Sequence, residues 1–232
     1  MAERYVEFLE YLVRNHVSSL AQLAQDLFVL YVHQRKKGGF FVEFGACDGV
    51  AQSNTCVLER FFDWTGILAE PLPSQHAALA KNRKAAIDHR CVFSRSGETL
   101  AFAEIVDSPQ LSGIATFLGD DATRAGQSTQ QRFDVQTVSL NDLLAEHGAP
   151  MHIDYMSIDT EGSELEILRA FDFGKHEIDV LTVEHLSREG SEDQLETLLA
   201  SHGYRKVCAA ISRWDSWFLH ERVERCRWTD VP

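Results

Sequence analysis

The first stretch able to do chemistry is an apolar run that contains an acid and leads into two glycines. Phe40–Phe44 includes Glu43 and continues through Gly45 and Asp48 to Gly49. Glycine lets the backbone come close to a ligand, and the start of a following helix offers unpaired N–H groups. The stretch therefore predicts the turn of a nucleotide-type site between a buried strand and a helix.

Further acids and one histidine end later apolar runs. Ligands of open parallel sheets bind at the carboxyl ends of the strands, so these side chains should gather at one edge. The edge would hold Glu43, Asp48, Glu70, Asp159, Glu161, Glu184 and His185. This concentration of carboxylates excludes an anionic ligand and favours a cationic or hydroxyl-rich one.

The spacing and the charge of the first turn indicate which nucleotide binds. The turn has the spacing Glu-x-Gly-x-x-x-Gly, whereas dinucleotide sites carry Gly-x-Gly-x-x-Gly. Glu43 and Asp48 would repel a pyrophosphate but attract a sulfonium with an amino-acid tail. Glu70 can accept hydrogen bonds from both ribose hydroxyls in either kind of site. We therefore predict S-adenosylmethionine as the ligand.

Apolar runs alternate with helix signals along most of the chain, which predicts an α/β fold with a mostly parallel, doubly wound sheet. Helices are expected at 53–62, from Ser74 as N-cap to 82, from Ser139 as N-cap to about 148, after 162, and at 191–202. Strands are expected at 40–44, 65–70, 85–93, 100–106, 133–138, 152–159 and 178–183. Two successive strands, 204–211 and 214–219, predict an antiparallel C-terminal hairpin at the sheet edge.

Two segments lie outside this alternation. Residues 4–37 contain no Pro or Gly and have the apolar period of one or two amphipathic helices, which we expect to pack on the main fold. We divide the chain into an N-terminal helical extension, 1–38, and a ligand-binding domain, 39–232. We expect the irregular stretch 95–134, which includes a polar tract at 119–131, to cover the site.

Composition restricts the partners. The 232 residues include 22 Lys and Arg against 35 Asp and Glu, a formal net charge of −13. This charge disfavours nucleic acid and anionic membrane surfaces. The five scattered cysteines form no Cys-x-x-Cys pair, which favours reduced thiols in the cytoplasm. The sequence shows neither a signal peptide nor an apolar stretch long enough for membrane insertion.

Several of these motifs, in this order, resemble the FkbM-type S-adenosylmethionine-dependent methyltransferases. The motifs are Val42–Gly49 with Asn54-Thr55, Ala69–Pro71, Ile158–Leu165 and Val183–His185, and the resemblance covers about 39–219. It implies the class I methyltransferase (Rossmann-like) sheet of seven strands with an antiparallel last pair. It also implies methyl transfer to a hydroxyl, often on a sugar or secondary metabolite.

The resemblance also assigns residues to the cofactor. The first turn would surround the methionine end, Glu70 would bind the ribose, and Ser94 would lie near the adenine. The predicted cofactor-binding set is Glu43, Gly45, Ala46, Asp48, Gly49, Ser53, Asn54, Thr55, Glu70, Pro71 and Ser94.

Methyl transfer to an alcohol requires a base that removes the hydroxyl proton. It also requires that the methyl donor and the acceptor hydroxyl be held in line. The predicted catalytic set is Asp159, Glu161, Glu184 and His185. We predict His185 or Asp159 as the base and the two glutamates as groups that orient the acceptor. The same oxygens and imidazole are also potential ligands of a divalent cation, but we predict no metal from the sequence. A helix-dipole role for Glu161 and a structural role for His185 are the simpler alternatives.

The sequence thus predicts an O-methyltransferase for a hydroxyl of a sugar, glycan or secondary metabolite. The alternatives are a nicotinamide-dependent oxidoreductase and a non-catalytic binding protein with a methyltransferase fold. The expected partner is a small-molecule or carbohydrate acceptor, and the N-terminal helices offer a surface for a homo-oligomer. No motif identifies the acceptor molecule.

Overall fold

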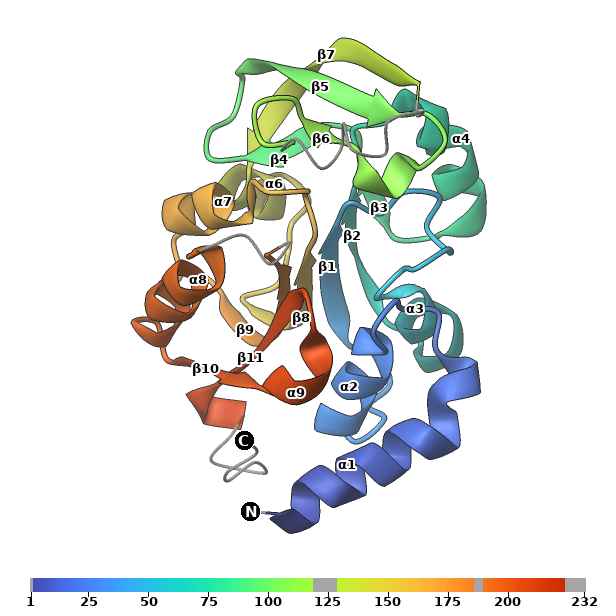
Figure 1. Ribbon diagram of the computed structural model, residues 1–232, viewed down its shortest axis with the longest axis vertical. Coiled ribbons are helices and arrows are strands. Elements are labelled where there is room, and N and C mark those ends of the chain that lie inside the picture. The colour runs from blue at the N-terminus through green and yellow to red at the C-terminus, as the bar shows by residue number, and fades with distance from the viewer. Residues whose placement is uncertain (1, 119–128, 186–189, 224–232) are drawn as a thin grey trace.

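A seven-stranded sheet forms the centre of the protein. The computed structural model describes residues 2–118, 129–185 and 190–223, and its main sheet has the order β10-β11-β9-β8-β1-β2-β3 (Figure 1). The strands are β1 (Phe40–Phe44), β2 (Thr65–Ala69), β3 (Ala86–Asp88), β8 (His152–Ile158), β9 (Glu177–Glu184), β10 (Tyr204–Val207) and β11 (Asp215–His220). Only β11 runs antiparallel to its neighbours β9 and β10. The predicted sheet with an antiparallel C-terminal pair is therefore confirmed.

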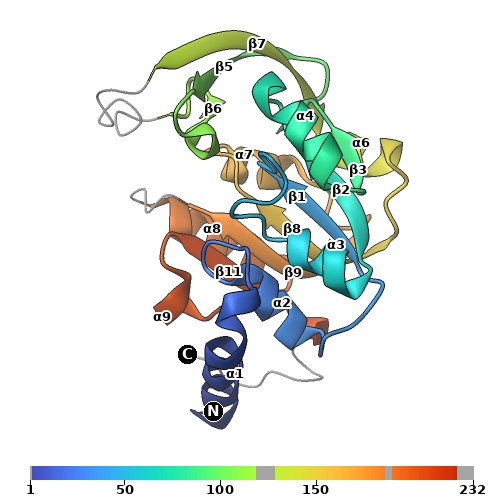
Figure 2. The same cartoon turned by 90° about the vertical axis from the view of Figure 1, so that its right-hand side faces the viewer.

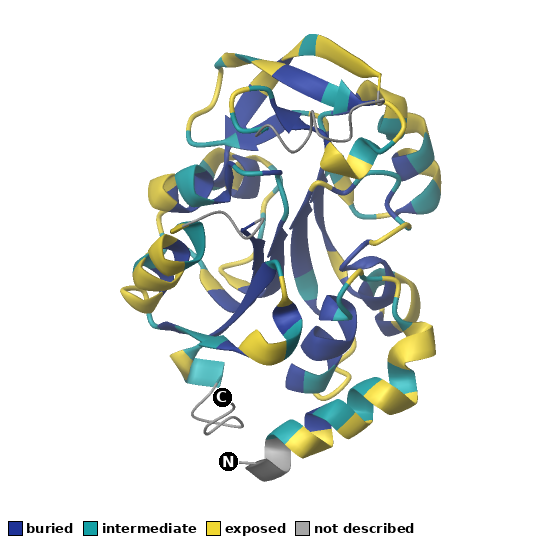
Figure 3. Cartoon of the chain, viewed as in Figure 1, coloured by how far each residue is buried: buried dark blue, intermediate teal, exposed yellow. Residues whose placement is uncertain are grey.

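Helices cover both faces of this sheet because successive strand residues point to opposite sides. Phe41 packs with the helices α3 (Cys56–Phe62) and α4 (Pro73–Asn82), whereas Val42 packs on the other face. The helices of that face are α6 (Leu140–Glu146), α7 (Glu164–Ala170) and α8 (Ser191–Ala200). Figure 3 shows the resulting pattern, with buried strands between helices that are exposed on their outer sides.

The N-terminal segment is helical, as its apolar period predicted. It forms α1 (Ala2–Asn15), the short 3-10 helix η1 (His16–Ser18) and α2 (Gln25–Val32). The Phe28 ring of α2 is fully buried and stacks on Trp217 of β11, with the ring centroids 4.7 Å apart. Phe8 of α1 packs edge-on against Phe28 in turn. Aromatic contacts therefore attach the N-terminal helices to the main sheet.

A second sheet lies beyond one end of the first (Figures 1 and 2). Its order is β4-β7-β5-β6, with β4 (Cys91–Phe93), β7 (Gln130–Ser139), β5 (Thr99–Ile105) and β6 (Gly113–Ile114). The 3-10 helix η2 (Pro109–Leu111) connects β5 to β6. Residues 119–128, which make up most of the polar tract within the stretch 95–134, lie outside the described residues.

The expected single strand at 85–93 is wrong, because the chain divides it between the two sheets. β3 ends the main sheet, and β4 pairs in parallel with β7 of the second sheet. The carboxylate of Asp88 accepts hydrogen bonds from the backbone and the guanidinium of Arg90. These bonds stabilise a turn between the two strands.

Local details of three helices also differ from the prediction. α4 begins at Pro73 with Leu72 in the N-cap position, so Ser74 lies inside the helix, because a proline fits the first helical position. α3 begins at Cys56, whose N–H donates to the Ser53 hydroxyl. A short helix, α9 (Ala209–Ser212), replaces the turn that we expected before β11. The predicted N-cap at Ser139 is confirmed, since its hydroxyl accepts from the Asp142 N–H.

Among the described helices, none is long and apolar enough to cross a membrane.

Replacing Phe28 by Ala should show how much the N-terminal helices contribute to stability. We expect Phe28→Ala to lower the free energy of unfolding by about 3–5 kcal/mol, the usual cost of deleting a buried aromatic ring. Phe61→Ala is the matched control, since this ring is 66% exposed and its loss should change stability by no more than about 0.5 kcal/mol. Urea unfolding measures both variants, and equal losses would contradict the packing of α2 on the sheet.

Candidate active site

The candidate site is a cavity between the carboxyl ends of the central strands and the second sheet. Its lower wall comes from the ends of β1, β2 and β8, and includes Gly45, Ala46, Cys47, Gln52, Ser53, Glu70, Pro71, Asp159, Thr160 and Glu161. Its upper wall includes Phe102, Pro109, Gln110 and Ser112 from the second sheet and η2. The space between these walls, including its opening to solvent, is about 720 Å³.

Gly45 brings the turn after β1 against the turn after β8. Its φ is +74°, and a Cβ atom at this position would lie 2.2 Å from the carbonyl oxygen of Asp159. Any other residue would collide with that backbone oxygen and would also adopt a left-handed conformation at a cost. Glycine is therefore required for the two turns to line one cavity.

Glu70 ends β2 as a buried acid facing this cavity. Its side chain is only 2% exposed, and its two oxygens accept hydrogen bonds from the N–H groups of Leu72 and Cys47, at 2.8 and 2.6 Å. Burial raises the pKa of Glu70 to about 7, although both N–H groups favour the ionised form. Each carboxylate oxygen keeps acceptor capacity for a ligand hydroxyl.

Glu43 does not line the cavity. This carboxylate is 3% exposed and accepts hydrogen bonds from the Asn54 N–H at 2.7 Å and from the hydroxyls of Ser53 and Thr55. The guanidinium of Arg83 lies 3.5 Å away as its buried counter-charge. Glu43 therefore holds the chain after Gly49 in place, and its predicted contact with the methionine end stays a prediction.

Arg83 is the residue that sequence reasoning missed. Its side chain is fully buried and also pairs with Glu59 at 3.2 Å and donates to the Gly49 carbonyl and the Thr55 hydroxyl. A signal was present, because an acid inside an apolar strand needs a buried cation or hydrogen-bond donors. No local pattern distinguishes Arg83 from the other arginines of the chain.

The remaining predicted cofactor residues lie beside the cavity without lining it. Asp48 accepts from the N–H groups of Val50 and Ala51 and so closes the turn. Asn54 donates to Ser157, while its buried Oδ1 has no hydrogen-bond partner within the described part of the chain. Ser94 follows β4 in the second sheet. The residues predicted to bind the cofactor that do not line the cavity are Glu43, Asp48, Gly49, Asn54, Thr55 and Ser94.

The turn after β8 presents two acids to the cavity. Glu161 adopts a left-handed backbone with φ of +58°, which costs energy for a residue other than glycine. The carboxylate of Glu164 holds the turn by accepting from the N–H groups of Thr160 and Gly162, both at 2.9 Å. Gly113 of β6 packs behind Glu161, since a Cβ there would lie 3.0 Å from the Glu161 Cβ. The second sheet therefore helps to fix the direction of Glu161.

The structure brings together three of the four predicted catalytic residues. One carboxylate oxygen from each of Asp159, Glu161 and Glu184 lies within 4.8 Å of the others, and we name these residues the carboxylate cluster. Burial raises the pKa of both Asp159 and Glu184, and the neighbouring acids raise that of Glu184 further.

His185 does not join the carboxylate cluster. Its buried ring has Nε2 at 3.8 Å from a carboxylate oxygen of Glu192. The ring lines a neighbouring pocket together with Ser191. Its backbone N–H donates to the Trp214 carbonyl. Glu184 lines the same neighbouring pocket as His185, and one of its carboxylate oxygens lies within 4.8 Å of the other two acids of the carboxylate cluster.

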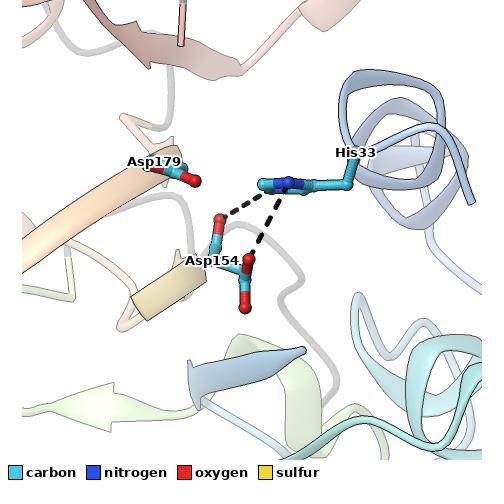
Figure 4. A group of neighbouring side chains, drawn as sticks. All are labelled: His33, Asp154 and Asp179. Atoms are coloured by element: carbon cyan, nitrogen blue, oxygen red, sulfur yellow. Dashed lines mark hydrogen bonds and ion pairs between the residues drawn. The ribbon is translucent and has the colours of Figure 1, made fainter. Parts of the chain in front are cut away.

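A second set of potential metal ligands lies at the opposite, amino end of the strands. His33 of α2 points toward Asp154 of β8 and Asp179 of β9 (Figure 4). Lys36 already pairs with Asp154 at 2.6 Å, and Arg222 pairs with Asp179 at 3.1 Å. Because both acids have cationic partners, we interpret this set as ion pairs that fix α2 to the sheet.

Comparisons with known proteins identify relatives. Residues 43–206 match the family described as methyltransferase FkbM domain. A protein described as Methyltransferase 1 from Beauveria bassiana (strain ARSEF 2860) is 26% identical over 184 residues, which cover 71% of this chain and 72% of that protein. The family match spans both the turn after β1 and the carboxylate cluster.

Solved structures with a similar chain path include two methyltransferases. One, from Pyrococcus furiosus, aligns with a TM-score of 0.44 at 9% identity, over 94% of this chain and 97% of its own. The other is the O-methyltransferase from Bacillus cereus in complex with SAH. It aligns with a TM-score of 0.43 at 12% identity, over 91% of this chain and 87% of its own.

Removing the buried charge of Arg83 should destabilise the fold strongly. Arg83→Met leaves Glu43 and Glu59 without their cation, so we expect the free energy of unfolding to fall by about 3–5 kcal/mol. Arg60→Met removes an exposed arginine and should cost no more than about 0.5 kcal/mol. Urea unfolding measures both, and a loss for Arg83→Met no larger than the control would show that this ion pair has no structural role.

Proposed function

The chain belongs to the FkbM methyltransferase family, and from this premise we propose that it transfers the methyl group of S-adenosylmethionine to a hydroxyl of a sugar, glycan or secondary metabolite. The observation that carries the proposal is the cavity that has Glu70 on one side and the acids Asp159 and Glu161 on another. Among the described residues, neither lysine nor arginine lines it. A cavity of this charge favours a sulfonium over a dinucleotide pyrophosphate.

The residues around Glu70 fit the proposed cofactor. The Glu70 carboxylate can accept hydrogen bonds from both hydroxyls of a ribose, and Gly45 leaves its side of the wall without a side chain. When bound, S-adenosylmethionine supplies the methyl group as an electrophile.

The acceptor hydroxyl would enter beside the carboxylate cluster. Asp159 and Glu161 line the cavity, so we propose Asp159 as the group that accepts the hydroxyl proton and Glu161 and Glu184 as the groups that orient the acceptor. The position of His185 outside the cavity favours Asp159 over His185 as the base. The net charge of −13 favours a small-molecule acceptor over nucleic acid.

Catalysis should depend on Asp159 while cofactor binding should not. The test incubates the protein with S-adenosylmethionine and a panel of glycans and hydroxylated metabolites, and detects a mass increase of one methyl group. We expect Asp159→Asn to lower kcat by about 10²–10⁴-fold, because it removes the proton acceptor, and to leave the calorimetric affinity for S-adenosylhomocysteine unchanged. Asp134→Asn, an exposed change on β7, is the control.

Two results would contradict this function. The absence of heat with S-adenosylhomocysteine would remove the methyltransferase proposal, and heat with NAD in its place would support the oxidoreductase. An unchanged kcat in Asp159→Asn would remove Asp159 as the base.

Cofactor affinity should depend on pH through Glu70. Because the pKa of Glu70 lies at about 7, the ionised form that accepts two ribose hydroxyls predominates only above that value. We expect the affinity for S-adenosylhomocysteine to fall as the pH drops through 7, approaching a tenfold loss per pH unit. Glu70→Gln should bind more weakly at high pH and lose this dependence. Calorimetry across the pH range measures the affinity of the unchanged protein and of Glu70→Gln. An identical pH profile in these two proteins would exclude Glu70 as the titrating group.

A further inference from the structure

We propose that the carboxylate cluster, Asp159, Glu161 and Glu184, binds one divalent cation of the Mg²⁺ type. One oxygen of each residue lies within 4.8 Å of the other two. Oxygen ligands at about 2.0–2.6 Å from a single Mg²⁺ or Ca²⁺ ion are separated from one another by no more than about 4–5 Å. The three oxygens therefore already have the spacing of a shared coordination shell.

The charges around the cluster also favour a cation. Some buried acids elsewhere in the fold have cationic partners, such as Arg83 beside Glu43, whereas Asp26 and Asp215 accept hydrogen bonds from neutral groups. Within the described ranges, no lysine or arginine pairs with Asp159 or Glu184. Buried charges in proteins are generally paired or bound to metals. The cluster differs from these acids in holding three carboxylates with one oxygen of each within 4.8 Å of the others.

Glu184 supplies an independent indication of a ligand. The residue is 7% exposed, and its Oε2 atom is buried with no hydrogen-bond partner among the residues that the structure describes. An unsatisfied carboxylate oxygen in the interior costs free energy unless a ligand compensates it. One carboxylate oxygen of each residue in the cluster lies within 4.8 Å of the other two. A cation bound among the three carboxylates would therefore compensate the buried charge of Glu184.

The surrounding structure holds the proposed ligands in place. Glu164 fixes the turn that carries Asp159 and Glu161 through the N–H groups of Thr160 and Gly162. Glu184 ends β9, which pairs with β8 up to Ile158. Asp159 and Glu161 also line the cavity, which gives the ion a path of entry. A rigid set of ligands with access from solvent is what a metal site requires.

The chemistry of the ligands selects the kind of ion. All three residues offer carboxylate oxygens, which suit Mg²⁺, Mn²⁺ or Ca²⁺, whereas zinc and copper favour nitrogen and sulfur ligands. Three protein ligands leave positions on the ion for water or for oxygens of the acceptor.

The consequence for catalysis rests on the proposed function, whereas binding of the ion does not. An ion at the cluster would lower the pKa of an acceptor hydroxyl bound to it. The role of Asp159 would then change from proton acceptor to metal ligand, and Glu161 and Glu184 would orient the acceptor through the ion.

Titration with Mn²⁺ tests the site directly. Free Mn²⁺ is measured by electron paramagnetic resonance on protein first treated with EDTA, and Mg²⁺ is then added as a competitor. We expect one Mn²⁺ site per chain that Mg²⁺ displaces. Glu184→Gln should weaken it by at least about tenfold, since loss of even an outer partner of a metal ligand costs that much. Glu161→Gln, on a different element, should do the same and serves if Glu184→Gln does not fold.

Glu166→Gln is the matched control, because this carboxylate lies on α7 beside Arg169 and outside the cluster. It should bind Mn²⁺ as the unchanged protein does. The absence of a Mn²⁺ site would overturn the inference. So would a Mn²⁺ affinity that is the same in Glu184→Gln and Glu161→Gln as in the control Glu166→Gln.

The same preparations separate the cation from the proposed function. Methyl transfer that stops in EDTA and returns with Mg²⁺ would support the inference. Full methyl transfer in EDTA would overturn the catalytic role of the ion and leave the methyltransferase proposal intact. A cluster that binds Mn²⁺ in a protein without affinity for S-adenosylhomocysteine would support the metal site and overturn the proposed function.

Discussion

The buried pair of Glu43 and Arg83 is the interaction on which the cofactor side of the structure depends. Glu43 lies within an apolar strand and would cost several kcal/mol there without partners. Arg83, at the end of α4, reaches back under the turn and contacts Glu43, Glu59 and the Gly49 carbonyl. The pair therefore joins β1, α3 and α4 beneath the cavity. It fixes the first turn while the cavity itself stays open for a ligand.

The distribution of charge distinguishes structural acids from candidate functional ones. At the amino end of the strands, Asp154 and Asp179 each have a cationic partner. At the carboxyl end, Asp159 and Glu184 have no lysine or arginine partner in the part of the chain that the structure describes. Such concentrated negative charge is unfavourable for stability and is typical of a site that binds a cation or handles protons. This contrast supports the proposal that the site lies at the carboxyl edge of the sheet.

The second sheet completes the site. Phe102 and Ser112 form part of its upper wall, and Gly113 packs behind Glu161. The segment from Arg95 to Asp134 looked irregular because many residues of its strands are polar and exposed. Long-range pairing decides such segments, since β5 pairs with β7 residues that lie 25 positions away at Ile105 and 37 positions away at Thr99. Local pattern carries little information about pairing at that distance.

The sequence by itself determined the strand and helix order, the antiparallel last pair and the family. Apolar period and strand-end acids are local features, and they placed Glu70, Asp159 and Glu161 at strand ends that line one cavity. Only the tertiary structure decided which acids face that cavity and which have partners. Glu43 proved to be paired with Arg83, and the His185 ring lies 3.8 Å from the Glu192 carboxylate and outside the carboxylate cluster. These outcomes depend on contacts between residues far apart in the chain, which no local pattern specifies.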